Sequence, residues 1–121
     1  MATFDHAASI PPQQIWDGVV ARPVHGERVT LGLIELAPGA VVPEHSHENE
    51  QLGFLVEGSM TFTAGGETGE IQPGGSWRIL ANVPHSVVAG PEGAVVVEVF
   101  SPPRHEWASI PASEPGPGRW P

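Results

Sequence analysis

The chain has 121 residues, which is enough for one compact domain with its own hydrophobic core. Fourteen acidic residues against five basic ones give a formal net charge of −9. This charge argues against nucleic acids and anionic membrane surfaces as partners, because both require a basic patch. A small anionic substrate remains compatible, since a local cation can outweigh the overall charge. Without cysteine, any metal site must be built from nitrogen and oxygen ligands.

Short apolar segments separated by Gly and Pro predict an all-β chain. Residues 1–15 show no clear period and are expected to form an arm or a short strand. From residue 29 onward, apolar and β-branched segments alternate with turn signals, and no segment has a helical period. This pattern is typical of a small sandwich or barrel. The strands predicted in this part are 29–37, 51–57, 60–63, 67–71, 76–80, 85–89 and 94–100.

The end of the chain has a different composition. Residues 105–121 are rich in Pro and Gly, so they are expected to be extended or mobile and to add no strand. We therefore predict a single domain over 1–121, with a core of about 29–104 and an extended tail over 105–121. The chain starts with no basic-then-apolar leader and has no apolar run of membrane-spanning length, which makes the cytoplasm the expected location.

Three histidines and a glutamine form a candidate metal site. His45 and His47 are one residue apart and would project from the same face of a strand, while His85 follows a second turn-rich stretch. Together with Gln51, they suit one divalent ion (Ni, Zn, Mn, Fe or Co) with positions left open for water or substrate. The alternative is a pair of surface histidines on a polar loop. A surface or structural role is expected for His6, His25 and His105.

Two sequence patterns resemble the motifs of the cupin family. The first is Gly39-x5-His45-x-His47-x3-Gln51-x6-Gly58, and the second is Gly74 followed by Asn82-Val83-Pro84-His85. The resemblance covers roughly residues 34–104. It implies an all-β, cupin-type double-stranded β-helix (a jelly-roll barrel) with a flexible N-terminal arm and a Pro/Gly-rich C-terminal tail.

The chain departs from these motifs at a few positions. Asn82 replaces a glycine, and asparagine tolerates left-handed backbone angles, so the turn can survive. Leu80 and Ala89 also differ from the usual residues. The most informative departure is Gln51, which stands where cupins usually have a glutamate. An amide does not neutralise a metal ion, so the ion should be a stronger Lewis acid that favours an anionic or chelating substrate.

A second group of candidate residues lies at the end of the last predicted strand. By alternation, Glu98 shares a face with Val96 and Phe100. If this face lines the barrel, burial would raise the pKa of Glu98 and suit it to general acid/base work; otherwise Glu98 faces solvent. Arg104 follows Ser-Pro-Pro and is a candidate for clamping a carboxylate, the alternative being a surface ion pair.

These features together resemble the pectin-degradation group of cupins. Enzymes of that group open the ring of 4,5-unsaturated uronates to the linear keto form, using a divalent metal on three histidines and one glutamine. The resemblance implies Glu98 and Arg104 as catalytic residues, and Phe100 and Arg104 as substrate-binding residues. The acidic residue in that group is typically Asp, so Glu98 is one methylene longer.

Other functions stay open from the sequence. One is a cupin dioxygenase or a polyketide or natural-product cyclase, and another is a non-catalytic metal- or sugar-binding cupin.

Small cupins commonly dimerise, so a homodimer is expected. Residues that could line a pocket mouth, but are more often plain core, are Phe54, Met60 and Trp77.

Overall fold

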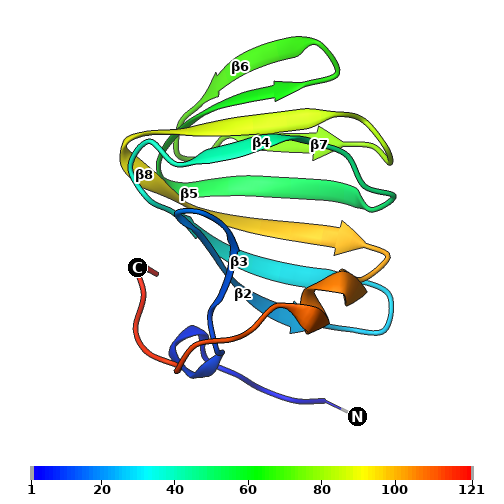
Figure 1. The fold of residues 1–121 in the computed structure, drawn as a ribbon, viewed down its shortest axis with the longest axis vertical. Coiled ribbons are helices and arrows are strands. Elements are labelled where there is room, and N and C mark those ends of the chain that lie inside the picture. The colour runs from blue at the N-terminus through cyan, green and yellow to red at the C-terminus, as the bar shows by residue number, and fades with distance from the viewer. Residues whose placement is uncertain (1, 121) are drawn as a thin grey trace.

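The computed structural model describes residues 2–120, and its architecture confirms the predicted all-β jelly roll (Figure 1). All strand pairs are antiparallel, in the order β1-β2-β3-β8-β5-β6, with β4 also pairing with β8 and β7 with β5. The elements are the 3-10 helix η1 (Ala7–Ser9), β1 (Gln13–Trp16), β2 (Val19–His25), β3 (Thr30–Leu36), β4 (Val41–His45), β5 (Glu50–Ala64), β6 (Glu67–Ile71), β7 (Ser76–Ile79), β8 (His85–Ser101) and the 3-10 helix η2 (His105–Ser109).

The two longest strands hold the fold together. The second half of β8 pairs with β3 and with the first half of β5, whereas the first half of β8 pairs with β4 and with the second half of β5. Because β5 and β8 run through both halves of the sheet, the sheet curves around one core, as the stacked ribbons in Figure 1 show. The predicted hairpin at Gly65-Gly66 joins β5 to β6, and both glycines have positive φ.

The structure merges strands that the sequence analysis treated as separate. Segments 51–57 and 60–63 form one strand, bent where the β5–β8 register shifts next to Gly58, which has a φ of 87°. Segments 85–89 and 94–100 likewise form one strand, and the turn predicted between them is a bulge across which the pairing jumps from Ala89 to Ala94. A bulge bends a strand without ending its pairing, which local turn signals do not distinguish from a true turn.

The core extends beyond the predicted range of 29–104. Val19 and Ala21 of β2 are buried, as is Trp107 in the tail. The prediction of an extended tail was wrong for residues 105–109, which form η2, because the Trp107 side chain turns inward to pack on the core. Gln13 fixes this turn by donating to the carbonyls of Trp107 at 2.9 Å and Ile110 at 2.8 Å.

Neither of the short 3-10 helices within residues 2–120 has the length and apolar character that crossing a membrane requires.

Candidate metal centre

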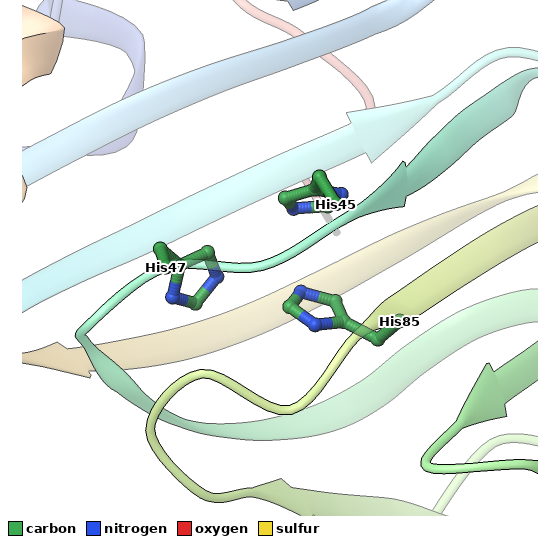
Figure 2. Close-up of side chains that lie close together, drawn as sticks. All are labelled: His45, His47 and His85. Carbon is green, nitrogen blue, oxygen red and sulfur yellow. The ribbon is translucent and has the colours of Figure 1, made fainter.

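Three histidines lie close together, as Figure 2 shows. His45 is the last residue of β4 and lies directly opposite His85, the first residue of β8. His47 lies in the loop between β4 and β5, so the expectation that His45 and His47 share one strand face was wrong: the strand ends between them. The loop nevertheless turns His47 back, and one ring nitrogen from each histidine lies within 4.8 Å of the others.

Backbone carbonyls orient all three imidazole rings. The Nδ1 atoms of His45, His47 and His85 lie 2.8, 3.0 and 2.9 Å from the carbonyl oxygens of Pro43, Asn49 and Val83. A carbonyl only accepts, so each Nδ1 carries the proton, and in its neutral form each ring presents its Nε2 lone pair to the centre. This is the arrangement in which protein histidines bind metals. The Nε2 atom of His85 is buried and has no hydrogen-bond partner among the described residues, and a bound cation would satisfy it.

Gln51 completes the donor set from β5. Its Oε1 lies 3.1 Å from Nε2 of His47, while its Nε2 donates to the carboxylate of Glu98. The Oε1 and the His47 Nε2 are then both lone-pair acceptors facing one another, which is unfavourable unless a cation lies beside them. Two donors at about 2.1 Å from one ion lie at most about 4.2 Å apart, so small side-chain shifts would gather these groups around one metal.

Burial and nearby charges favour the neutral form of two of the histidines, His47 and His85. Burial is the main cause that lowers the pKa of His85 to about 4; the hydrogen bond to Val83 opposes it, and the neighbouring His45, His47 and Arg104 contribute to the lowering. Burial and the charge of Arg104 also lower the pKa of His47. Metal ligation requires neutral imidazole, so the residues present fit a divalent ion.

Glu98 faces the interior of the barrel. It is 9% exposed and lines the same cavity as His45, Gln51 and His85, which resolves the alternatives left open by strand alternation. Burial raises the pKa of Glu98 to about 7, although the hydrogen bond from Gln51, the Trp77 indole and the charge of Arg104 each lower it. A carboxyl group in this environment exchanges protons near neutral pH.

Arg104 is held between aromatic rings. Its guanidinium carbon lies 4.7 Å from the ring centroid of Phe100 and 4.8 Å from that of Trp107. Its backbone N–H donates to Oγ1 of Thr30 at 2.9 Å, and its Nε pairs with Glu106. Arg104 makes an ion pair, yet its side chain is only 12% exposed and lines the cavity.

The cavity that these groups line has a volume of about 80 Å³, and most of its lining is apolar. Phe100 is buried in this lining, with its ring 6.0 Å from that of His47. Met60 also lines the cavity, whereas Phe54 lies outside it and is 49% exposed. The remaining aliphatic lining residues are Ile15, Val19, Ile34, Leu36, Val42 and Val87.

Sequence reasoning missed three residues around the site. Trp16 lines the cavity, with its ring 5.4 Å from that of His45, and Trp107 lines it from the tail. Asn49 is buried, accepts from His47 through its carbonyl and donates from its side chain to the Pro102 carbonyl. Its position two residues after His47 was the one available signal; the two tryptophans lie outside any motif.

Comparison with known proteins identifies the family and two similar groups of proteins. Residues 32–100 match the model of the cupin domain family. The chain is 25% identical over 99 residues to the pectin degradation protein KdgF of Dickeya dadantii, covering 80% of this chain and 90% of that protein.

Solved structures support the same fold. An RmlC-like cupin from Shewanella frigidimarina has a TM-score of 0.81 at 22% identity, covering 88% of this chain and 96% of its own. KdgF from Halomonas sp. also has a TM-score of 0.81, at 24% identity, covering 88% and 98%. At these identities the structures establish a shared fold. With the family match covering more than half of the chain, the protein belongs to the cupin domain family.

Proposed function

We propose that this cupin is a metal-dependent enzyme that converts cyclic 4,5-unsaturated uronates to their linear keto form. The observation that carries the proposal is that Glu98 and Arg104 line the same cavity as Gln51, His45 and His85, with His47 beside the other two histidines. A pectin-degradation protein among the relatives supports a sugar acid as the substrate class.

The proposed ligands are His45, His47, Gln51 and His85, and an ion held there would supply a Lewis acid for a substrate oxygen. Arg104 would bind the carboxylate through its guanidinium, which the rings of Phe100 and Trp107 hold at the cavity wall. Phe100 would also contact the sugar ring.

Glu98 would carry the proton of the isomerisation. The anomeric hydroxyl loses its proton, the bond between C1 and the ring oxygen breaks, and C1 becomes an aldehyde. The electron pair passes to the ring oxygen and the adjacent double bond, and C4 gains a proton as C5 becomes a ketone. No atom is lost or gained overall, so one buried carboxyl group that gives and regains a proton is sufficient.

The assay measures loss of the enol-ether ultraviolet absorbance of unsaturated galacturonate or mannuronate. Metal-loaded protein should accelerate this loss over buffer, and the His85→Ala variant and chelator-treated protein should not. Glu98→Gln should abolish turnover while substrate affinity is largely kept. If metal-loaded wild-type protein leaves the buffer rate unchanged, the assignment is wrong.

The apolar lining of the cavity favours a second candidate. A hydroxyl-rich sugar would leave polar groups against aliphatic side chains such as Ile34, Val42 and Met60, at a cost of about 1–3 kcal/mol for each unpaired group. An enolisable substrate with one chelating end and an apolar body avoids this cost, which suits a cupin dioxygenase or cyclase. Oxygen uptake by Fe(II)-loaded protein with a small β-diketone would support the dioxygenase.

A third function is binding without turnover. In that case Glu98→Gln and the wild-type protein would both bind the uronate, and neither would change its absorbance.

A further inference from the structure

The orientation of one amide group decides whether Gln51 can bind a metal. Only Oε1 of a glutamine is a good metal ligand, and the amide can present either end to the site. Here Nε2 of Gln51 donates to Glu98, which leaves Oε1 facing His47 at 3.1 Å. Rotating the amide by half a turn would place its NH₂ group toward the histidines and its oxygen against the Glu98 carboxyl group.

Glu98 belongs to a row of cross-strand partners on β8, β5 and β7. Gly53 on β5 is the cross-strand partner of both Glu98 on β8 and Trp77 on β7. A Cβ atom on Gly53 would lie 2.1 Å from the Trp77 indole, so the indole lies over Gly53 in the space that a side chain would fill. The indole N–H has no well-formed hydrogen bond of its own, yet it lies close enough to the Glu98 carboxyl group to lower its pKa.

We propose that Glu98 is the positioning residue of the metal centre: by accepting from Nε2 of Gln51, it holds Oε1 toward the three histidines. Trp77, seated over Gly53, holds the Glu98 side chain in place. This role is separate from proton transfer, because it acts through Gln51 and requires only an acceptor at position 98. The inference rests on the metal centre of the proposed function and not on the reaction.

The test is a thermodynamic cycle on metal affinity, measured by calorimetry with Co(II) and by the visible Co(II) spectrum, which reports the number and geometry of ligands. The variants are Glu98→Gln, Glu98→Leu, Gln51→Ala and the double variant Gln51→Ala/Glu98→Leu. A glutamine at position 98 can still accept from Gln51, whereas a leucine cannot. The melting temperature of each metal-free variant controls for loss of the fold.

Glu98→Gln should keep the wild-type spectrum and an affinity within about threefold, although turnover is lost. Glu98→Leu should weaken Co(II) binding about 10- to 100-fold, the usual effect of removing a group that orients a ligand. In the Gln51→Ala background, the same leucine substitution should change the affinity by less than about twofold, because its effect passes through Gln51.

Two outcomes would overturn the proposal. Equal loss of affinity in Glu98→Gln and Glu98→Leu would mean that the charge of Glu98 matters and not its acceptor. Equal loss from Glu98→Leu with and without Gln51 would mean that the two residues act independently. If the leucine variant does not fold, Glu98→Gln alone decides, since a loss of about tenfold or more contradicts the proposal. A failed uronate assay with this affinity pattern intact would reject only the proposed reaction.

Discussion

At the scale of single residues, the site depends on glycines that leave room for neighbouring groups. Gly58 has a φ of 87°, and a Cβ there would lie 2.0 Å from the carbonyl oxygen of Gly93. Gly58 thus lets β5 bend where β8 passes closest to it. Gly53 similarly leaves room for the Trp77 indole beside Glu98.

A series of three glycines separates backbone strain from crowding. Gly58→Ala should lower the free energy of unfolding by more than about 3 kcal/mol, because it adds a backbone clash to a left-handed φ. Gly39 has a φ of 69°, but among the described residues no atom lies within 4 Å of an added Cβ. Gly39→Ala should therefore lower the free energy of unfolding by about 1 kcal/mol or slightly more. Gly69→Ala has neither feature and is the control. Urea denaturation measures all three, and equal losses at Gly58 and Gly69 would contradict this account of the bend.

Single histidines should differ sharply in their effect on metal binding. The buried Nε2 of His85 points into the site, whereas His105 is exposed on η2. A bound ion should raise the melting temperature of the wild type, since a ligand that binds only the folded state stabilises it. The rise should be lost in His85→Ala and kept in His105→Ala, as scanning calorimetry with and without chelator would show. A rise of equal size in both variants would place the ion elsewhere.

At the scale of elements, η2 closes one side of the cavity. Trp107 is 3% exposed, and its ring lies 5.3 Å from that of Phe100 and beneath the guanidinium of Arg104. The short helix therefore ties the tail to β8 and sets the position of Arg104. Beyond η2, Ala112 pairs with Gln13 of β1, and Arg119 contacts Glu35 and Leu36 of β3.

Truncating this side chain should cost stability and substrate binding together. Trp107→Ala should lower the free energy of unfolding by about 3–5 kcal/mol, the usual loss for a buried aromatic residue. Because Arg104 would lose one of its two supporting rings, the affinity for the uronate should fall as well. Trp120→Ala removes a tryptophan that is 41% exposed and is the matched control. If the two variants unfold at the same urea concentration, η2 is not part of the cooperative core.

At the scale of the whole molecule, the outer face of the sheet carries several exposed apolar side chains. Two rows of paired residues cross β2, β3, β8 and β5 on this face. Leu52 and Phe54 on β5 are 46% and 49% exposed. Glu50 lies on the same face, two residues before Leu52. Arg78 on β7 is the cross-strand partner of Leu52. The apolar members of the rows are Val24, Leu31, Leu33, Leu52, Phe54, Val97 and Val99.

The homodimer expected from the sequence stays a prediction, and this face is where we expect its interface. A second copy related by a two-fold axis would bury the apolar rows and could bring Arg78 of one chain to Glu50 of the other. Light scattering should show a dimer for the wild type and a monomer for Phe54→Lys. Val88→Lys, at an exposed valine paired with Val41 on β4, should remain dimeric. A monomeric wild type would reject the prediction.

Much of the candidate site could be predicted because it is local in sequence. His45, His47 and Gln51 lie close together in the sequence, at the end of β4, in the following loop and at the start of β5. The turn at Asn82, which has a φ of 65°, then leads into His85. Alternating apolar residues and the Gly-Gly hairpin likewise determined the all-β class.

Only the tertiary structure decided the features that depend on pairing between distant strands. Glu98 faces inward, and the register of β5 on β8 places it beside Gly53 and within reach of Gln51, 47 residues away in sequence. The same pairing continues across two positions where the sequence predicted strand ends, and the strands bulge there instead. Trp107 is buried because it packs against residues distant in the sequence. Local propensity cannot encode such contacts, because they depend on which segments become neighbours. The sequence by itself thus determined the fold class and named the candidate metal ligands, and the folded chain decided what lies behind and opposite them.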